Sequence, residues 1–309
     1  MERKANNETQ KSLSKVVINW FPGHMAKARR QIEEDLKLVD VVIELIDARI
    51  PISSQNPDLR NILKNKKVIK VLNKSDLSEV IENKRWKDYF IKQGTNAVIV
   101  NSNTGQGIDE VIRKVEEIMR EKIESFSEKG RIGRKIRVMI VGIPNVGKSS
   151  FINRISKKNS AEVGNKPGVT KNKQWIRINE KVELLDTPGV LWPKFESERV
   201  ALNLAFIGTI KDTILAQTEI AYQLLKYLLN NYIENICDRY NLKKEELEEI
   251  LNQDNEENIN IYEIMIKIGE KNGALIKGGN VDDEKTAKII LDDFRTGKLG
   301  KITLEKNIF

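Results

Sequence analysis

Cysteine, histidine and long apolar runs are all scarce in this chain of 309 residues. Cys237 is the only cysteine, which excludes a disulfide framework and a cysteine-based zinc cluster. No run approaches the roughly 20 apolar residues that a membrane-spanning helix needs. The first residues are polar and include an acid, so they resemble neither a signal peptide nor an arginine-rich transit peptide. We therefore expect a cytoplasmic protein that has no membrane partner.

Positive charge is concentrated in the first two thirds of the chain. The net charge is +8, yet residues 201–309 carry 14 basic and 19 acidic side chains, which leaves residues 1–200 at +13. A basic region favours a polyanionic partner such as RNA, because such binding releases counterions. Lysine-rich solvated faces would explain the same numbers, and charge alone leaves both interpretations open.

Short apolar, β-branched runs alternate with helical stretches before residue 196. The runs are 40–47, 68–72, 97–100, 136–141 and 182–185. Near-continuous apolar strands that alternate with helices predict an α/β fold, with a mostly parallel sheet and helices on both faces. After residue 196 the apolar residues recur at helical spacing. We therefore predict an α/β domain over residues 1–195, with a polar N-terminal tail, and a smaller all-helical domain over residues 196–309.

A glycine-rich loop follows the apolar run at 136–141. It reads Gly142-Ile-Pro-Asn-Val-Gly147-Lys148-Ser149 and matches the phosphate-binding loop pattern. In this pattern backbone N–H groups converge on phosphate oxygens, Lys148 reaches the β- and γ-phosphates, and the hydroxyl of Ser149 coordinates Mg²⁺. The predicted phosphate-binding residues are Asn145, Val146, Gly147, Lys148, Ser149, Ser150 and the later Gly189.

Two motifs indicate that the nucleotide base is guanine. Asn73-Lys74-Ser75-Asp76 follows a predicted strand and resembles the guanine-specificity motif of GTPases. In that motif the carboxylate of Asp76 accepts hydrogen bonds from N1–H and the 2-amino group, which adenine does not offer. Asn73 supports the loop, and the stem of Lys74 lies on the ring. Asn101 and Ser102 follow the next strand and are a looser match to the motif that contacts the guanine oxygen.

Two further motifs concern the γ-phosphate and Mg²⁺. Asp186-Thr187-Pro188-Gly189 follows the run at 182–185, and in GTPases such an aspartate holds Mg²⁺ while the glycine amide senses the γ-phosphate. Thr170 lies between the phosphate loop and Asp186, where a switch threonine is expected. The predicted Mg²⁺ ligands are Ser149, Thr170 and Asp186.

The order of these motifs is unusual. GTPases ordinarily begin with the phosphate loop and end with the guanine motif, whereas here the guanine motif comes first, at residue 73. The sequence therefore predicts a circularly permuted P-loop GTPase, in which the same sheet is entered at a different strand. The segment after Asp186 then leads directly into the helical domain, so that hydrolysis could move that domain.

With these motifs the chain resembles the ribosome biogenesis GTPase A family over nearly its whole length. The resemblance includes Asn19–Ala28, Gly208–Asp212 and Asp293–Gly300. It implies a GTPase that binds GTP and GDP and assists late maturation of the large (50S) ribosomal subunit. Its implied partners are ribosomal RNA and ribosomal proteins, and we expect a monomer away from the ribosome.

The catalytic step lacks one familiar residue. The position after Asp-x-x-Gly, where a glutamine orients the attacking water in Ras-like enzymes, is Val190 here. We therefore expect slow turnover by the protein alone. His24 lies in a Gly-His-Met loop that the resemblance marks as functional, and we hypothesise that it enters the site on the ribosome. The predicted catalytic residues are His24, Lys148, Thr170 and Gly189. Asn145 either holds K⁺ beside the phosphates or only shapes the loop.

Candidate RNA contacts lie near both ends of the chain. They are Lys27, Arg29, Arg30, Lys285, Lys288, Arg295, Lys298 and Lys301. The helical domain carries a net negative charge, which does not favour binding to RNA alone. Part of its contact is therefore either through a local basic face or with ribosomal protein, and the sequence leaves both alternatives open. Two alternative functions also remain at this point. One is a GTP-gated RNA-binding protein whose hydrolysis is incidental, and the other is a permuted GTPase that acts on another RNA.

Overall fold

The computed structural model describes residues 25–63, 65–128, 135–159, 175–185, 195, 197–210, 216–253 and 257–306. The chain divides into two compact units near Pro193 and again between Ile302 and Thr303. We call them the sheet unit, with described residues from 25 to 185 and 303–306, and the helical unit, with described residues from 195 to 302. The sequence placed the last residues in the helical domain, whereas Thr303–Lys306 belong to the sheet unit.

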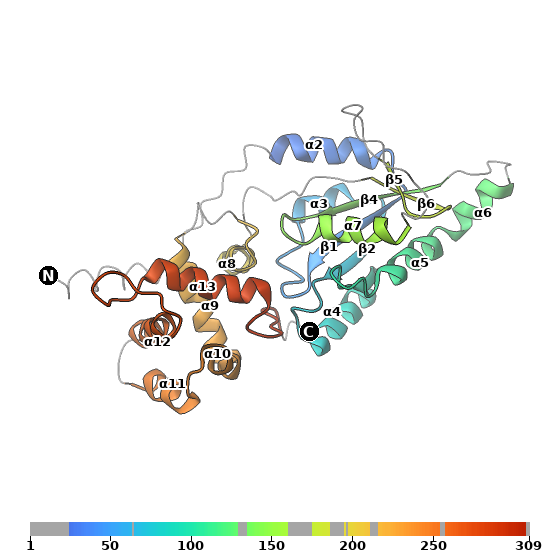
Figure 1. Cartoon of the computed structure of the whole chain (residues 1–309). Coiled ribbons are helices and arrows are strands. Elements are labelled where there is room, and N and C mark those ends of the chain that lie inside the picture. Colours follow the sequence, from blue (N-terminus) through green and yellow to red (C-terminus); the bar gives the residue numbers. More distant parts are fainter. Residues whose placement is uncertain are drawn as a thin grey trace. The chain divides into compact units, whose positions relative to one another are not determined.

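The sheet unit is built on a six-stranded sheet with the order β3-β2-β1-β4-β6-β5 (Figure 1). Every neighbouring pair is parallel except β5 and β6. The strands are β1 (Val41–Asp47), β2 (Lys67–Asn73), β3 (Asn96–Ile99), β4 (Ile136–Gly142), β5 (Trp175–Arg177) and β6 (Val182–Leu185). All the strands expected from the sequence are present. Among the described strands, the short edge strand β5 alone was not predicted.

The described helices of the sheet unit are α2 (Met25–Leu36), α3 (Pro57–Ile62), α4 (Val80–Lys92), α5 (Ile108–Ile118), α6 (Arg120–Glu128) and α7 (Lys148–Asn159). Helix α2 precedes β1, and the other described helices of this unit connect the strands. Met119 separates α5 from α6, which begins at the next residue. Strand, helix and parallel strand follow one another, so the predicted α/β class with a mostly parallel sheet is confirmed.

The helical unit contains α8 (Glu198–Phe206), α9 (Gln217–Asn231), α10 (Ile233–Tyr240), α11 (Lys244–Leu251), α12 (Glu257–Lys271) and α13 (Asp283–Thr296). Helices α9 and α13 pack together, and α12 packs on both. The side chain of Asp282 caps the start of α13 by accepting a hydrogen bond from the Lys285 amide, and Gly297 ends this helix in the left-handed conformation.

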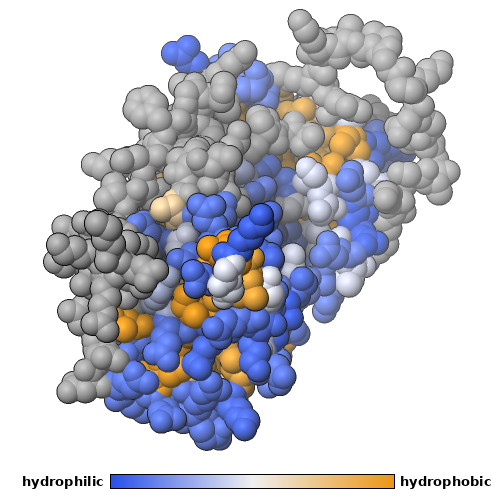
Figure 2. Space-filling view, turned by 60° about the vertical axis from the view of Figure 1, so that its left-hand side comes forward, coloured by the Kyte–Doolittle hydropathy of each residue, from blue (hydrophilic) through white to orange (hydrophobic). Residues whose placement is uncertain are grey.

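On the face drawn in Figure 2, the surface of the described residues is mainly polar. Figure 2 shows a face on which hydrophilic side chains predominate and apolar side chains occupy smaller, separate areas. Among the described helices, none is both long enough and apolar enough to cross a membrane.

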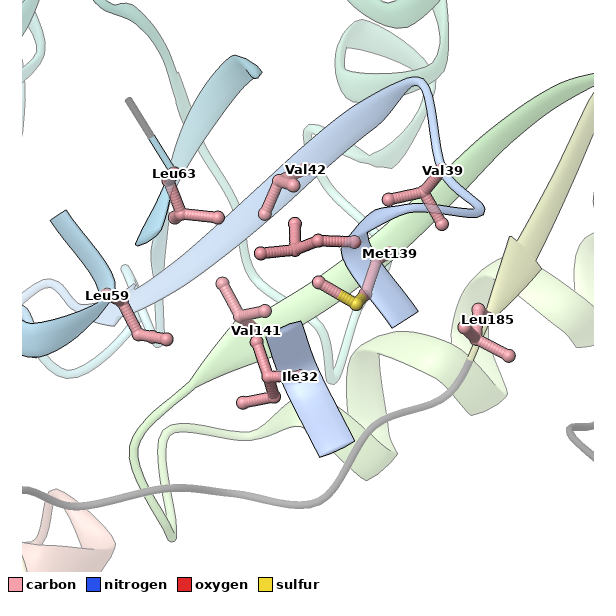
Figure 3. Packing of buried hydrophobic residues seen from close by; sticks show 9 residues of the cluster. Ile32, Val39, Val42, Leu59, Leu63, Met139, Val141 and Leu185 are labelled. Carbon is pink, nitrogen blue, oxygen red and sulfur yellow. The ribbon is translucent and has the colours of Figure 1, made fainter. Parts of the chain in front are cut away.

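Both faces of the sheet are covered, because every residue of β1 is buried. On one face, Ile32 of α2 and Leu59 of α3 pack against Val42, Met139 and Val141 of the central strands (Figure 3). On the same face, Trp86 and Phe90 of α4 pack against Ile46 and Leu72. Helix α5 contacts β2 and β3, and α7 contacts β4 and β5. This packing holds the carboxyl ends of the parallel strands side by side.

Candidate functional site

The sequence motifs meet at the carboxyl edge of the parallel sheet. The strands β1, β2 and β4 end at Asp47, Asn73 and Gly142, and Asn101 follows β3. Neighbouring parallel strands present these ends on one side of the sheet, which is where open α/β folds bind ligands. The phosphate-loop and guanine motifs are therefore neighbours in space although they are about 70 residues apart in the sequence.

The phosphate loop leads from β4 directly into α7. Its Val146 is fully buried, whereas the side chains of Asn145, Ser149 and Ser150 are exposed. The Lys148 ammonium donates hydrogen bonds to the carbonyl oxygens of Gly142 at 3.1 Å and Ile143 at 2.7 Å. The loop thus places a cation and exposed hydroxyls at the N-terminus of a helix, an arrangement that suits an anion.

Asn73 joins the phosphate loop to the guanine loops. Its Nδ2 donates to the Val146 carbonyl at 2.8 Å, and its Oδ1 accepts from the Ser102 hydroxyl at 2.7 Å. The Asn73 side chain also explains Gly147, whose φ is +94°, because a Cβ there would lie 2.4 Å from Asn73 Nδ2. One buried amide therefore fixes the relative positions of three loops.

Lys74 adopts a left-handed backbone conformation, with φ at +58°, which a residue other than glycine rarely takes. Its ammonium lies 3.2 Å from the carboxylate of Asp47 at the end of β1. The same carboxylate accepts two hydrogen bonds from the Arg49 guanidinium, at 2.9 and 2.8 Å. Asp47 and Arg49 are both fully buried, so this cluster holds Lys74 through a charge pair that is shielded from water.

The charges of this cluster change its ionisation. Burial opposes the ionisation of Asp47, but the positive charges of Arg49 and Lys74 and the hydrogen bonds from Arg49 outweigh it, so the pKa of Asp47 lies below its usual range. Burial lowers the pKa of Lys74, and the Asp47 carboxylate partly offsets that effect. The carboxylate of Asp47 is therefore charged throughout the neutral range.

Asp76 provides an acceptor that the described residues do not satisfy. Its Oδ1 is buried and has no hydrogen-bond partner within the part of the chain that the structure describes. Helix α4 supports the loop that contains Asp76, because Asn83 of this helix donates a hydrogen bond to the Ser75 carbonyl at 3.3 Å. A buried carboxylate oxygen without a donor is costly, and a ligand that offers N–H groups would satisfy it. This is the chemistry that guanine provides.

The loop after β3 closes the same site. Asn101 Oδ1 accepts from the amides of Asn103 and Thr104 at 2.9 and 3.2 Å, which shapes the loop as a turn. From α7, the Arg154 guanidinium donates to the Ser102 carbonyl at 3.2 Å. Asn101 and Ser102 are therefore next to Asn73, as their positions in the sequence suggested.

Several predicted site residues lie outside the described residues. They are His24, Thr170, Asp186 and Gly189, together with Val190. Their predicted roles in catalysis and in Mg²⁺ binding stay predictions. Leu185, directly before Asp186, is the last residue of β6, and β6 pairs in parallel with β4.

Sequence reasoning missed Asp47, Arg49 and Arg154. For the first two a signal exists: Asp47-Ala48-Arg49 places two opposite charges at the end of a strand that is otherwise almost entirely apolar. Charged residues in that position of a parallel sheet mark a site. Arg154 has no such signal, because only the tertiary structure brings α7 to the loop at Ser102.

The predicted RNA contacts of the helical unit fall into two groups. Arg295 donates hydrogen bonds to the carbonyl oxygens of Phe206 and Ala205, both at 3.0 Å, and Lys298 lies 3.3 Å from the buried carboxylate of Asp293. Arg295 therefore has a structural role, whereas Lys298 keeps 59% of its side chain exposed and stays a predicted RNA contact. Lys285, Lys288 and Lys301 are exposed. In the sheet unit, Arg30 is exposed on α2, whereas the side chains of Lys27 and Arg29 lie outside the description.

Comparison with known proteins gives consistent results. A family model described as "50S ribosome-binding GTPase" matches residues 137–265. The chain is 47% identical to Ribosome biogenesis GTPase A of Bacillus licheniformis over 291 residues, which covers 94% of this chain and 99% of that protein. It is 34% identical to Mitochondrial ribosome-associated GTPase 1 of Mus musculus, over 94% of this chain and 91% of that protein.

A solved structure is similar over almost the same length. It is GNP-bound YlqF from T. maritima, which is 26% identical and has a TM-score of 0.61. The match covers 90% of this chain and 97% of that chain. The similarity therefore spans both the sheet and the helical regions of the chain.

Asp76→Asn should weaken GDP binding by about 100-fold, since hydrogen bonds to a charged acceptor contribute about 1.5–3 kcal/mol each. Asp88→Asn, on the exposed side of α4, is the matched control and should bind GDP like the unmodified chain. Titration calorimetry measures both. Equal affinities for the two variants would show that Asp76 does not contact the base.

Asp47→Asn should lower the free energy of unfolding at pH 7 by about 3–5 kcal/mol, because Arg49 then remains buried without a counter-charge. The folded-state pKa of Asp47 is lowered, so its contribution is present above the unfolded pKa near 4 and is lost as the pH falls through the folded value. Urea unfolding should therefore show that the free energies of unfolding of the variant and of the unmodified chain become more similar below about pH 4. A difference that is constant from pH 7 to pH 3 would contradict this assignment.

Proposed function

Because the chain belongs to the ribosome biogenesis GTPase A family, we propose that it binds the immature large ribosomal subunit, hydrolyses GTP there and promotes its late maturation. As a member of this family the protein is a GTPase, which converts GTP to GDP and phosphate and acts in ribosome assembly. The observation that carries the proposal is the similarity to Ribosome biogenesis GTPase A proteins over 94% of the chain.

In this proposal the guanine base binds beside Asp76, which accepts hydrogen bonds from N1–H and the 2-amino group. The unsatisfied Oδ1 of Asp76 supports this role. The stem of Lys74, anchored by Asp47, lies on the face of the base, and Asn101 and Ser102 form the loop near the guanine oxygen. ATP would leave the buried carboxylate without donors, so the site selects GTP.

The phosphates bind at the loop from Gly142 to Ser150. Lys148 exchanges its two carbonyl contacts for phosphate oxygens and stabilises the charge that develops on the β- and γ-phosphates. GTPases of this kind generally use Mg²⁺, and Ser149, Thr170 and Asp186 are the residues proposed to hold it. The exposed hydroxyl of Ser149 at the start of α7 fits this ligand chemistry. When bound, Mg²⁺ neutralises charge on the phosphates, and Gly189 senses the γ-phosphate.

Water activation is the step that the chain performs differently from Ras-like enzymes. Val190 has no group that can orient a water molecule, so we propose that His24 does so once the protein is bound to the ribosome. The exposed Asn145, with φ at +61°, is proposed to hold K⁺ beside the phosphates. These two roles predict turnover that is slow in isolation and depends on the partner and on the salt.

GTP turnover in KCl should rise at least about tenfold when purified large ribosomal subunits are added, since completing water orientation and charge stabilisation accounts for larger factors in other GTPases. Replacing KCl with NaCl should reduce the stimulated rate. Turnover that does not respond to the subunit, with GTP-dependent co-sedimentation intact, would favour a nucleotide-gated binding protein. If the subunit neither stimulates turnover nor co-sediments with the protein, the ribosomal partner is excluded, whereas the assignment as a GTPase is unaffected.

His24→Ala should abolish the subunit-stimulated turnover, since general-base assistance contributes about 10²–10⁴ in rate. GTP affinity, measured by calorimetry on the same sample, should not change, because His24 is outside both nucleotide-binding motifs. Stimulated turnover equal to that of the unmodified chain would remove His24 from the mechanism.

A further inference from the structure

Residues 303–306, which we call the C-terminal strap, pack on the sheet unit next to the loops that carry the guanine motif. Glu305 is 3% exposed although it carries a carboxylate. One carboxylate oxygen accepts the Ile52 amide at 2.6 Å, and the other accepts the Ser53 amide at 3.0 Å and the Ser53 hydroxyl. A buried carboxylate is tolerated where such hydrogen-bond donors satisfy it.

The strap holds the turn that follows β1. Besides the contacts of Glu305, the Leu304 amide donates to the Arg49 carbonyl at 2.9 Å. Arg49 in turn donates to Asp47, which lies 3.2 Å from the ammonium of Lys74. A continuous chain of contacts therefore runs from Leu304 through Arg49 and Asp47 to the guanine motif.

The strap also holds the helix on the other side of that motif. The Glu79 amide, at the start of α4, donates to the Thr303 hydroxyl at 3.1 Å, and the Trp86 indole donates to the Glu305 carbonyl at 2.9 Å. Lys306 forms an ion pair with Glu79 at 2.8 Å. Helix α4 reaches the guanine motif through Asn83, which donates to the Ser75 carbonyl.

We propose that the C-terminal strap positions the guanine-binding loop, with Glu305 as its principal positioning residue. The strap ties together the two supports of residues 73–76, the turn after β1 and helix α4. Lys74 needs such support, because its left-handed backbone is strained and persists only where surrounding contacts fix it. Guanine-nucleotide affinity then depends on a segment more than 200 residues away in the sequence.

The proposal rests on the proposed contact of Asp76 with guanine and is independent of the ribosomal partner. It concerns the guanine end of the nucleotide, so it predicts a change in base discrimination as well as a general weakening of binding. Inosine diphosphate lacks the 2-amino group and can give Asp76 only one of the two hydrogen bonds. The ratio of GDP to inosine diphosphate affinity therefore reports how well the loop is positioned.

Two variants release the strap at different points. Glu305→Gln puts an amide donor where the turn at Ile52 and Ser53 needs an acceptor, and Thr303→Val removes the acceptor for the Glu79 amide. Each should weaken GDP binding about three- to tenfold and lower the GDP preference over inosine diphosphate. Glu180 is exposed and lies between β5 and β6, at the edge of the sheet opposite to β3. Glu180→Gln should therefore change neither the GDP affinity nor the preference for GDP over inosine diphosphate.

Calorimetric titration of the full-length chain with GDP and with inosine diphosphate measures these effects, and Asp76→Asn is the positive control. If Asp76→Asn removes the GDP preference while both strap variants keep it, the strap is only structural and the proposal is wrong. If Asp76→Asn keeps the preference, the assignment of the guanine loop itself is wrong.

Hydrogen exchange on the unmodified chain gives a test that does not depend on the folding of any variant. Coupling between two sites is reciprocal, so GDP should increase the protection of the Ile52, Ser53 and Leu304 amides. Increased protection in the phosphate loop without any change at these three amides would overturn the proposal.

Discussion

The nucleotide site depends on one buried side-chain amide. Asn73 uses both ends of its amide, since Nδ2 holds the phosphate loop at Val146 and Oδ1 holds the loop after β3 at Ser102. Gly147 has no side chain at the point where this amide passes. The phosphates and the base of one nucleotide must be bound at a fixed separation, and Asn73 fixes the separation of the loops that we propose bind them.

This interaction also shows why a permuted chain can form the same site. Parallel strands place their carboxyl ends together whatever the order in which the chain visits them, so β2 can supply the guanine motif before β4 supplies the phosphate loop. The permutation changes what is attached to the site. The chain leaves the sheet unit near Pro193, forms the helical unit, and returns at Thr303. The helical unit is therefore inserted between the segment after Asp186 and the C-terminal strap.

The buried strands and the nucleotide motifs were predictable because they follow local rules. Runs such as Val41–Ile46 are apolar at nearly every position, and a glycine-rich loop before a helix binds phosphate for reasons of backbone geometry. The family resemblance, which rests on the same motifs, is confirmed by the relatives. The strand Trp175–Arg177 was missed because three residues are too few to show a period.

The contacts that support the site were not predictable, because they join residues that are distant in the sequence. Nothing in the local sequence indicates that Arg154 reaches Ser102 or that Glu305 is buried against Ser53. The same limitation applies to Arg295, which was predicted as an RNA contact and which donates a hydrogen bond to the Phe206 carbonyl in the structure. Charge identifies a group that needs a partner, and only the tertiary structure identifies the partner.

We propose that one edge of the sheet binds a guanine nucleotide through motifs that occur in permuted order. The most direct test is the affinity of the unmodified chain for GDP and for ADP, measured by calorimetry under the same conditions. GDP should bind at least about 100-fold more tightly than ADP, because ADP leaves the carboxylate of Asp76 without donors. Equal affinities would contradict the proposal, since a phosphate loop alone does not distinguish the two bases.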